Sequence, residues 1–388
     1  MHSTSLLLYT FATSFCIALN ILVIVVPLIA LTLGFTPFQI GLIVAVPGMM
    51  QILSRFPGGM LADRFGERRV MLGSAVAILM SSLIFWGVQA FGAILVAQGL
   101  IGLARSFFYD SCQSYASRWR PKEANRTLGF YISSVNLGNV SGFVLGGVMA
   151  ASFGYGWAFG MAVLFAAGSL IVVARMQELS QRPVTRFRQY IVPMLRARPL
   201  YLAGIAAFVA ASPVILMGSF YPVYFRHLGY SDGMVGLLAS MHSIGTILSG
   251  FTYRAFERRL SKSVLFAGSI SGVGLLMAFS VLFTSAWSLA AWLILLGTFS
   301  GYTNILYLQM TTEHSPPEQR GIGMAISGQF WSLANFAVPF AFGILVGLTD
   351  IREAFWWGGA AVLSIGLMTP LLFALLLNRY PGMLHSSS

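Results

Sequence analysis

Apolar runs of roughly 20 residues recur along the whole chain, and this feature constrains the fold more than any other. A helix of about 20 residues is about 30 Å long, which matches the thickness of the hydrocarbon core of a bilayer. Charged residues make up only 9% of the 388 residues, and the mean hydropathy is +0.80. A soluble domain carries about 25% charged residues. The sequence therefore predicts an all-α membrane protein without a separate soluble domain.

We expect twelve transmembrane helices, each centred on one apolar run. Their predicted positions are 7–31, 38–58, 70–89, 92–116, 126–152, 155–176, 199–225, 233–253, 264–284, 287–311, 321–347 and 354–377. The first run is long and lacks a small-residue cleavage site, so we interpret it as a retained helix rather than a signal peptide.

The basic residues indicate the orientation of these helices. Of the 23 Lys and Arg, only Arg226 and Arg352 fall in connections on one side of the membrane. Arg105 falls inside a predicted helix, and the others lie in or beside the connections on the other side. The positive-inside rule makes that side cytoplasmic and places both termini there. The formal charge of +12 thus reflects topology, and we do not expect a nucleic-acid partner.

The two cysteines, Cys16 and Cys112, both fall inside predicted helices. We interpret them as small apolar residues rather than as a disulfide or a metal site. The sequence predicts neither a metal ion nor another cofactor.

The chain contains an internal duplication. Residues 27–56 align without a gap to residues 222–251, at an offset of 195. The identical pairs include Pro27/Pro222, Leu33/Leu228, Gly34/Gly229, Gly41/Gly236, Leu42/Leu237 and the triplet Ile52-Leu53-Ser54/Ile247-Leu248-Ser249. Residues 126–133 align to residues 320–327 at an offset of 194. A unit of about 194 residues is therefore predicted to occur twice.

Each copy holds six predicted helices, an even number, so both copies are expected to enter the membrane in the same orientation. Their pseudo-two-fold axis then lies along the membrane normal, as in the parallel repeats of secondary transporters. We expect two pseudo-symmetric six-helix bundles at 1–176 and 199–388, joined by a cytoplasmic linker at 177–198. The linker is basic and contains Pro183 and Pro193. It either lies against anionic lipid headgroups or has a regulatory role.

Residues 58–69 concentrate charge between two apolar runs. Their sequence, GGMLADRFGERR, resembles the loop between helices 2 and 3 of the major facilitator superfamily, in which Gly-x-Leu-Ala-Asp-Arg-x-Gly is followed by basic residues. The matching residues are Gly59, Leu61, Asp63, Arg64, Gly66, Arg68 and Arg69. Glu67 stands where the family usually has a basic residue. Because helix number, central linker and duplication also agree, the resemblance covers the whole chain.

The resemblance implies that this stretch is a cytoplasmic latch that holds the two halves together and favours the outward-open state. The implied latch residues are Gly59, Asp63, Arg64, Gly66, Arg68 and Arg69. Gly59 and Gly66 allow tight turns, and Asp63 can accept charge-assisted hydrogen bonds at the N-terminal end of a helix. The alternative is that these charges only determine topology. The second copy keeps a Glu-Arg-Arg run at 257–259 but has no acid matching Asp63, so we expect an asymmetric latch.

Glycines recur on one side of the fifth predicted helix. Their positions are Gly138, Gly142, Gly146 and Gly147. This spacing resembles the family pattern Gly-x-x-x-Gly-Pro-x-x-Gly-Gly, which is associated with its antiporter branch. Small residues four apart let two helices pack closely in lipid. Phe143 replaces the proline of the pattern, so close packing without a role in antiport is the alternative.

A charged side chain at the bilayer centre costs about 2.5–3.5 kcal/mol, so each one in this chain needs a reason. Arg105 lies near the middle of the fourth predicted helix and can bind an anionic group or a carbonyl of a substrate. The alternative is a structural bond to backbone carbonyls. Asp110 lies about 7.5 Å further along the axis and roughly 140° around it, so a direct pair is not expected. Asp110 is the first candidate for proton coupling; the alternative is a salt bridge with Arg118 or a loop arginine.

His242 lies at the centre of the eighth predicted helix, where the first copy has Pro47. Histidine changes its charge readily near neutral pH, so His242 is the second candidate for proton coupling. The alternative is a neutral histidine of the core. Glu313 and His314 end the tenth predicted helix, and we interpret them as a gate or a loop contact.

In the major facilitator superfamily, helices 1, 4, 7 and 10 line the cavity. Carried onto this sequence, the resemblance implies the substrate-binding residues Asn20, Arg105, Tyr221, Tyr224, Tyr302, Asn304 and Tyr307. At an offset of 194, Asn304 corresponds to Asp110, which places polar groups at matching depth in both copies. Aromatic and amide groups with few charges suit a moderately hydrophobic solute that is neutral or singly charged. Packing is the alternative role of each tyrosine.

These features together predict a secondary active transporter of a bacterial inner membrane that alternates access to one central site. The preferred function is proton-coupled efflux of a small amphiphilic drug or metabolite, in which protonation of Asp110 or His242 alternates with substrate binding. Uptake of a small organic anion held by Arg105 is the first alternative, and a transport-inactive receptor or a channel is a remote one. An enzyme is not expected, because the sequence shows no metal-ligand or nucleophile spacing. The expected partners are the substrate, protons and lipid, and the expected state is a monomer.

Overall fold

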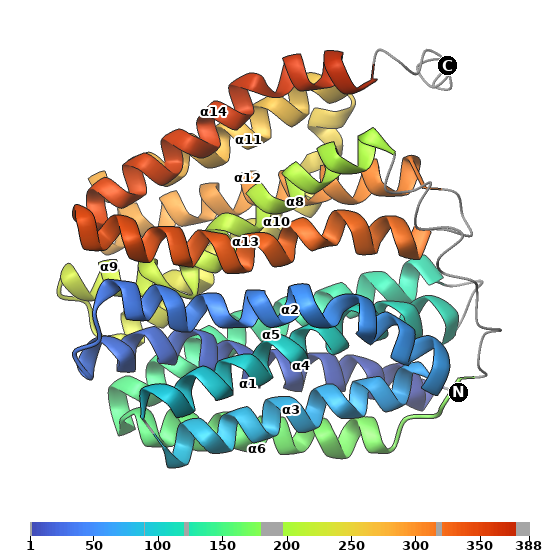
Figure 1. The fold of residues 1–388 in the computed structure, drawn as a ribbon, viewed down its shortest axis with the longest axis vertical. Helices are drawn as coiled ribbons and strands as arrows, with labels where there is room; N and C mark the ends of the chain where they lie inside the picture. Colours follow the sequence, from blue (N-terminus) through green and yellow to red (C-terminus); the bar gives the residue numbers. More distant parts are fainter. Residues whose placement is uncertain (1, 89, 120–123, 180–196, 316–319, 378–388) are drawn as a thin grey trace. The chain divides into compact units, whose positions relative to one another are not determined.

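The computed structural model describes residues 2–88, 90–119, 124–179, 197–315 and 320–377. Twelve helices in this part of the chain are long and apolar enough to cross a membrane, which confirms the predicted number. The helices are α1 (His2–Thr32), α2 (Pro37–Phe65), α3 (Glu67–Gly87), α4 (Phe91–Trp119), α5 (Ala124–Phe153), α6 (Tyr155–Ala174), α8 (Arg198–Met217), α9 (Phe220–His227), α10 (Asp232–Glu257), α11 (Lys262–Phe279), the short 3₁₀ helix η2 (Ser280–Leu282), α12 (Ala286–Glu313), α13 (Arg320–Leu348) and α14 (Ile351–Leu377) (Figure 1).

The seventh apolar run departs from its prediction. The sequence predicts one helix over 199–225, whereas the structure has α8 and α9, interrupted at Gly218 and Ser219. Ser219 has a φ of −141° and a ψ of −82°, outside the helical region. Pro222 lies in the first turn of α9, where its missing N–H breaks no helical hydrogen bond. The helix therefore stops where glycine and serine precede a proline that can begin a new one.

The charged stretch 58–69 is largely helical, so the prediction of a loop was wrong. α2 continues to Phe65 and α3 begins at Glu67, which leaves Gly66 alone between them. Gly66 has a φ of 93°, a conformation that a residue with a Cβ atom adopts only under strain. Residues 60–62, Met-Leu-Ala, favour helix, so the chain needs no turn before this glycine.

The duplication recurs in the turns that end α1 in the first copy and α9 in the second. Gly34 and Gly229, which are 195 residues apart, have φ angles of 76° and 87°. The N–H of Gly34 donates to the carbonyl of Leu31, and the N–H of Gly229 donates to that of Arg226. Helices commonly end in this way, with glycine in the left-handed region. The offset found in the sequence therefore also relates equivalent hydrogen bonds.

The start of the following helix is repeated as well. Thr36 precedes α2, and its Oγ1 accepts from the N–H of Gln39 at 3.3 Å. Ser231 precedes α10, and its Oγ accepts from the N–H of Met234 at 3.4 Å. A hydroxyl in this place satisfies one of the backbone donors that the first helical turn leaves unpaired. The same local chemistry thus starts the second helix of each copy.

Two compact units are distinguished by the contacts between the helices. Of the described residues, unit 1 contains those in 1–185, 215–243 and 335–349, and unit 2 contains the remainder. The predicted bundles end at different residues from these units, and they stay a prediction. Most of the predicted linker at 177–198 lies outside the described residues.

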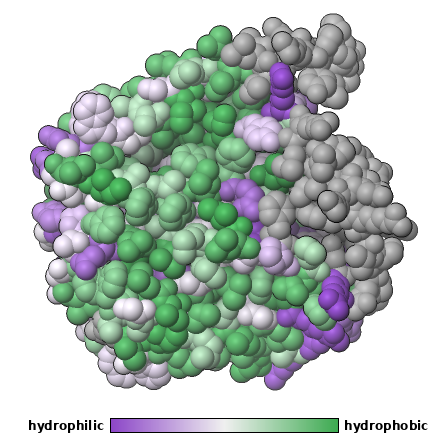
Figure 2. Space-filling model, viewed as in Figure 1, coloured by the Kyte–Doolittle hydropathy of each residue, from purple (hydrophilic) through white to green (hydrophobic). Residues whose placement is uncertain are grey.

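In unit 1, α1 packs against α5 and α6, and α3 packs against α4 and α6 (Figure 1). Most of α1 is buried by these neighbours. Over these N-terminal helices, the visible face carries mainly hydrophobic side chains, and the hydrophilic ones gather toward the helix ends (Figure 2). This distribution is expected of helices whose outer surface contacts lipid.

In unit 2, α11 packs against α14 and α12. Glycines bring the backbones of α11 and α14 together: a Cβ atom on Gly274 would lie 2.4 Å from the backbone nitrogen of Leu363. A Cβ atom on Gly359 would likewise lie 2.4 Å from the backbone nitrogen of Ala278. Small residues therefore set the distance between these two helices, as is common in membranes.

Candidate functional site

Arg105 of α4 is partly buried inside the first copy. Its Nε atom is buried and has no hydrogen-bond partner among the described residues. Cys16 of α1 and Tyr109 of α4 lie within electrostatic range of the guanidinium and of each other. A buried polar group without a partner is costly. Among the described residues, the Nε–H of Arg105 is therefore an unsatisfied donor.

Tyr131 of α5 lies close to the same group of residues. Its hydroxyl is buried and, within the part of the chain that the structure describes, has no hydrogen-bond partner. It lies within electrostatic range of Cys16, Tyr109 and Asp110. Our sequence analysis missed Tyr131 and Tyr109. A signal existed for Tyr131, because it lies in the duplicated segment 126–133, where the other copy has Ala325.

Asp110 of α4 pairs with Arg55 of α2. The Nη2 atom of Arg55 lies 3.3 Å from Oδ1 of Asp110, and the two side chains are 18% and 34% exposed. Asp110 thus faces a residue of another helix, as expected. Its partner was not foreseen, however, because the sequence suggested Arg118 or a loop arginine.

Arg118 instead pairs with Glu67, the first residue of α3. The carboxylate of Glu67 also accepts a hydrogen bond from Ser114 at 2.8 Å. The Glu67 side chain is 4% exposed and that of Arg118 is 17% exposed. This largely buried pair ties the start of α3 to the last turn of α4. It also explains how the first copy accommodates an acid where the family usually has a basic residue.

Asn20 of α1 is buried, and its amide joins two helices. The Nδ2 atom donates to the carbonyl of Cys16 and to Oδ1 of Asn139 on α5, both at 2.8 Å. Substrate binding by Asn20 stays a prediction, because these bonds already occupy its donors.

The glycines of α5 face two different helices. Gly138, Gly142 and Gly146 face α1, where an added Cβ atom would lie 2.6–2.7 Å from the nearest atom. Gly147 faces α10, where an added Cβ atom would lie 2.6 Å from the carbonyl oxygen of Asp232. Close approach of α5 to both helices therefore depends on the absence of side chains. A role in antiport stays a prediction.

The remaining candidates of unit 1 lie on α9 and α10. Tyr221 and Tyr224 of α9 are 0% and 1% exposed, and His242 of α10 is 3% exposed. The ring of Phe225 lies 5.8 Å from that of Tyr221 and 6.1 Å from that of Tyr224. Burial at this level favours packing, and the predicted roles of these residues stay predictions.

Tyr302, Asn304 and Tyr307 lie on α12 in unit 2. The hydroxyl of Tyr302 lies 2.7 Å from Oγ1 of Thr252 on α10, and its ring lies 5.7 Å from that of Phe256. Asn304 is half-buried, and Tyr307 is 7% exposed. Their proposed contact with substrate stays a prediction.

The register of α12 differs from the one assumed in the sequence. The pairs Glu67–Arg118 and Lys262–Glu313 are related by an offset of 195, so this offset extends to the end of the fourth helix of each copy. Asn304 then corresponds to Tyr109 rather than to Asp110.

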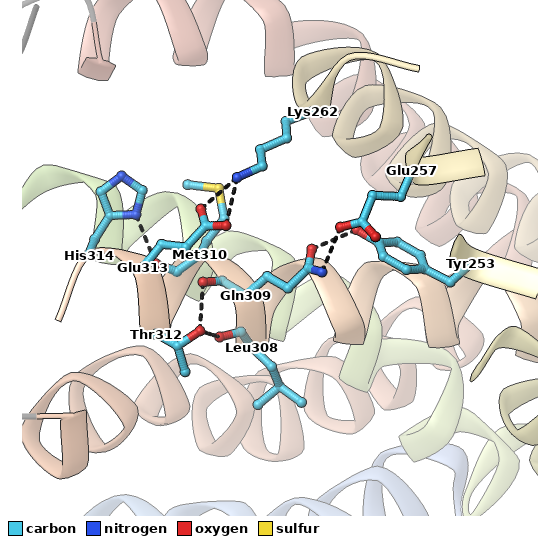
Figure 3. A network of polar contacts seen from close by, with 9 residues as sticks. All are labelled: Tyr253, Glu257, Lys262, Leu308, Gln309, Met310, Thr312, Glu313 and His314. Carbon is cyan, nitrogen blue, oxygen red and sulfur yellow. Dashed lines mark hydrogen bonds and ion pairs between the residues drawn. The ribbon is translucent and has the colours of Figure 1, made fainter. Parts of the chain in front are cut away.

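The second copy carries a polar network where α10 and α12 end and α11 begins (Figure 3). The Oε1 atom of Gln309 accepts from the hydroxyl of Tyr253 at 2.7 Å, and its Nε2 donates to Glu257 at 2.9 Å. Lys262, the first residue of α11, donates to both carboxylate oxygens of Glu313 at 2.6 and 2.8 Å. Glu313, which we interpreted as a gate or loop contact, thus holds the start of the neighbouring helix.

Arg68 of the predicted latch bonds within its own copy. Its Nη2 atom donates to the carbonyl of Ala174, the last residue of α6, at 2.6 Å, and its backbone N–H donates to Glu178 at 3.2 Å. A Cβ atom on Gly66 would lie 2.3 Å from Oε1 of Glu178. A basic side chain at the C-terminal end of a helix satisfies carbonyls that the helix leaves free.

The other latch residues make few contacts in the described part of the chain. Arg64 and Arg69 are exposed, and the guanidinium of Arg64 lies 5.2 Å from the centre of the Phe65 ring. The surroundings of Gly59 and the side chain of Asp63 are outside the described part. The latch therefore stays a prediction.

At the other end of the helices, unit 1 contains contacts between the two copies. The hydroxyl of Tyr155, the first residue of α6, donates to Oδ2 of Asp232 on α10 at 3.0 Å. The Nη1 atom of Arg226 lies 3.3 Å from Oδ1 of the same aspartate. Arg226 was expected on the extracytoplasmic side, so the bond from Tyr155 to Asp232 joins the copies at that predicted side, and Arg226 pairs with the same aspartate within the second copy.

Twelve candidate spans and a duplicated architecture define a multi-pass membrane protein. The model of the major facilitator superfamily matches residues 6–224 and 203–387 of the chain. The protein belongs to this family, and it is a secondary transporter rather than an enzyme.

Two kinds of relative agree with this membership. The chain is 26% identical over 334 residues to the enterobactin exporter EntS of Salmonella typhimurium strain LT2. This alignment covers 79% of this chain and 76% of the relative. It is also 26% identical over 256 residues to the inner membrane transport protein YnfM of Escherichia coli K12, covering 62% of this chain and 58% of the relative.

Solved structures show the same fold. A point mutant of the nucleoside transporter NupG superimposes with a TM-score of 0.78 at 13% identity, covering 95% of this chain and all of that one. An inward-facing, occupied bacterial homologue of the human lysosomal transporter Spinster gives a TM-score of 0.71 at 17% identity, covering 97% and 96%.

Proposed function

We propose that the protein exports a small amphiphilic metabolite in exchange for protons. In this proposal, Arg105 donates to the bound substrate, and Asp110 takes up and releases the coupled proton. The transporter resides in a bacterial inner membrane with both termini in the cytoplasm, and the monomer is the working unit.

Export is supported by the relatives. The proteins named enterobactin exporters align with most of this chain, and the relative from Escherichia coli is named an inner membrane protein. At 26% identity these names support export and an inner-membrane location, and not a particular solute.

The free Nε–H of Arg105 is the observation that carries the substrate site. An arginine that only stabilised the fold would be expected to use its buried donors within the protein. Hydrogen bonds to charged groups contribute about 1.5–3 kcal/mol, so a substrate acceptor placed here would bind well. The neighbouring aromatic ring of Tyr109 and the thiol of Cys16 suit an amphiphilic compound.

Asp110 is supported as the proton site by its surroundings. Its side chain is 34% exposed and so can exchange protons with water, while its counter-charge Arg55 is 18% exposed. His242 is 3% exposed, which makes it the weaker candidate.

The other predicted roles belong to the same proposal. Two six-helix bundles at 1–176 and 199–388 rock against each other, and the residues around Asp63 latch them on the cytoplasmic side. Asn20, Tyr221, Tyr224, Tyr302, Asn304 and Tyr307 complete the substrate site.

Proton-coupled uptake of a small organic anion is the second candidate. It is favoured by the same guanidinium, because Arg105 has no ion pair with an acid among the described residues. An anion would then replace the missing counter-charge.

Purified protein in liposomes separates these functions. The probes are enterobactin, the amphiphilic cation ethidium and the small anion benzoate, each labelled. Counterflow is measured first, because a carrier exchanges labelled for unlabelled solute whereas a receptor does not. Accumulation is then driven by a pH gradient that is acid inside or acid outside.

An acid-inside gradient that drives a probe into the vesicles supports proton exchange, whichever way the protein is inserted. Accumulation under an acid-outside gradient supports uptake with protons and overturns the export proposal. Arg105→Gln should weaken counterflow affinity at least tenfold, and Asp110→Asn should abolish accumulation while counterflow continues. Arg175→Gln, at an exposed position after α6, is the matched control and should behave as wild type.

A further inference from the structure

The ion pair between Arg55 and Asp110 lies well inside the helices that carry it. Arg55 stands about two and a half turns before the end of α2, and Asp110 stands at a similar distance from the end of α4. The two charged atoms are 3.3 Å apart, and neither side chain is fully exposed. The candidate membrane span of α2 ends at Arg55, and a partly buried pair adds little net stability.

The second copy shows that the fold does not require this pair. At the offset of 195, Arg55 and Asp110 correspond to Gly250 and Ile305. Near these positions the equivalent helices α10 and α12 are instead joined by neutral bonds, such as the one from Oγ1 of Thr246 to the carbonyl of Gly297 at 3.3 Å, whereas the bond from Gln309 to the carboxylate of Glu257 lies nearer the helix ends. The first copy therefore holds a charged pair where an uncharged contact suffices for packing.

We infer that Arg55 is the positioning residue of the proton-coupling step, an inference that rests on the proposed role of Asp110. Arg55 pairs with the Asp110 carboxylate and holds it turned toward α2. When a proton from the aqueous phase binds an Oδ atom, the carboxyl becomes neutral, the ionic attraction is lost and the pair separates. Release of the proton restores both charges and the pair.

Other groups around Asp110 do not replace Arg55. Tyr131 of α5 is within electrostatic range but is an uncharged hydroxyl. On α3, the charges of Glu67 and Arg68 are engaged at the ends of α4 and α6, and the side chain of Arg69 is exposed. The described side chains of α1 contain no charged residue. Among the described residues, Arg55 is thus the cation that pairs with Asp110.

The pair is also connected to the second copy along one face of α2. Gln51 lies one turn before Arg55, and its Oε1 accepts from Nδ2 of Asn335 on α13 at 3.2 Å. Both amides are buried, and a Cβ atom on Gly48 would lie 2.2 Å from the backbone nitrogen of Phe336. Separation of Arg55 from the carboxyl therefore changes a contact of α2, the helix that also packs against α13.

The test compares two readouts in liposomes, with whichever of enterobactin, ethidium and benzoate the carrier exchanges. Counterflow reports binding and movement of the carrier, and accumulation under a pH gradient reports coupling. The variants are Arg55→Gln, Asp110→Asn, the double variant and Arg55→Lys. Arg175→Gln again serves as the control. Removing one partner of the pair leaves an uncompensated charge, which a carboxyl relieves by taking up a proton.

We expect Arg55→Gln to keep counterflow within about twofold and to lose at least tenfold in accumulation. The double variant should be no worse than Asp110→Asn, because Arg55 acts through that carboxyl, and Arg55→Lys should retain coupling. If Arg55→Gln alone does not fold, the double variant, which removes both charges of the pair, provides the comparison with Asp110→Asn.

Three results would overturn the inference. One is an equal loss of counterflow and accumulation in Arg55→Gln, which marks a structural role. Another is full coupling in Arg55→Gln together with its loss in Asp110→Asn. A third is a double variant whose counterflow is at least tenfold below that of Asp110→Asn. Full coupling in Asp110→Asn is a different failure, because it removes the proposed proton site itself.

Discussion

The two copies of the repeat share their backbone chemistry and differ in their charges. The first helical segment of one copy and the helix α9 of the other end in left-handed glycines 195 residues apart, and hydroxyls at equivalent positions precede the next helices. The charges inside the membrane helices follow a different rule: Arg55, Arg105 and Asp110 of the first copy correspond to Gly250, Ser300 and Ile305 of the second. Since α2 and α4, which carry these charges, have the uncharged equivalents of these positions on α10 and α12, the charges are not requirements of these helices.

Arg105 and Ser300 illustrate this difference. The Oγ atom of Ser300 donates to the carbonyl of Ala210 on α8 at 2.9 Å, so its polar group is satisfied inside the helix pair. Arg105 faces Cys16 on the corresponding helix α1, yet its Nε has no partner among the described residues. The first copy thus keeps an unsatisfied donor in a place where the second copy has a hydroxyl with a hydrogen-bond partner.

The ion pairs that join the third and fourth helices of each copy have opposite polarity. Glu67 pairs with Arg118 in the first copy, and Lys262 pairs with Glu313 in the second, at the same offset of 195. The side chains of the second pair are 55% and 44% exposed, whereas the first pair is largely buried. Both copies thus place opposite charges at this junction, with either polarity, and only the first pair is buried.

The largest effect should come from reversing one charge of the buried pair. Glu67→Lys places two cations together in a largely buried position, and we expect the free energy of unfolding to fall by about 3 kcal/mol or more. Lys262→Glu, its matched change in the exposed pair, should cost less than about 1 kcal/mol. Thermal unfolding in detergent, followed by tryptophan fluorescence, measures both.

The exchanged pair Glu67→Arg with Arg118→Glu restores opposite charges with the polarity of the second copy. We expect it to regain most of the lost stability. Equal destabilisation by Glu67→Lys and Lys262→Glu would contradict the conclusion that burial distinguishes the two pairs.

The next largest effect concerns transport. Arg105→Gln removes a charged donor from the proposed substrate site, and we expect substrate affinity to fall by about tenfold to a hundredfold, since such a bond contributes about 1.5–3 kcal/mol. Ser300→Ala removes the equivalent polar group of the second copy and should lower stability by about 1 kcal/mol, with transport unchanged within twofold. Counterflow affinity and thermal unfolding are measured for each, and a greater transport defect in Ser300→Ala would refute the assigned asymmetry.

A smaller and equal effect is expected at the helix ends that the copies share. Gly34→Ala and Gly229→Ala each force a Cβ atom into the left-handed region, which costs about 1–2 kcal/mol. Gly268→Ala, within α11 and with no neighbour inside 4 Å, is the control and should not reduce stability. Unequal losses at Gly34 and Gly229 would show that the repeat does not extend to its turns.

The smallest effect should separate the two helix starts. Thr36→Ala removes a hydroxyl that takes part in a reciprocal capping arrangement with Gln39, and it should cost about 1 kcal/mol. Ser231→Ala should cost less, about 0.5 kcal/mol, because Met234 cannot return the hydrogen bond. Unfolding curves of the two variants are compared directly, and a larger loss in Ser231→Ala would contradict this ranking.

The number of helices and the duplication could be read from the sequence because both are local properties. An apolar run of 20 residues must cross the membrane as a helix, and a repeated glycine or hydroxyl produces the same turn or cap in each copy. The break at Gly218 and the helical state of residues 60–65 escaped prediction. Hydropathy reports the polarity of a segment, and it does not show where the backbone within an apolar segment leaves the helical conformation or where a polar segment stays helical.

The partners of the charged residues could not be read from the sequence. The spacing within α4 showed that Arg105 and Asp110 point in different directions, but it did not identify Arg55 or Tyr131 as neighbours of Asp110. Those neighbours lie on α2 and α5, and helix packing alone brings them there.

The sequence by itself determined which segments enter the membrane, where the copies begin and which residues carry charge, because each of these depends on side chains near one another in the chain. The tertiary structure decided which charges meet, which donor of Arg105 is left free and which ion pair is buried. These depend on the rotation and contact of helices that are far apart in sequence, and small residues along those helices determine how closely they approach.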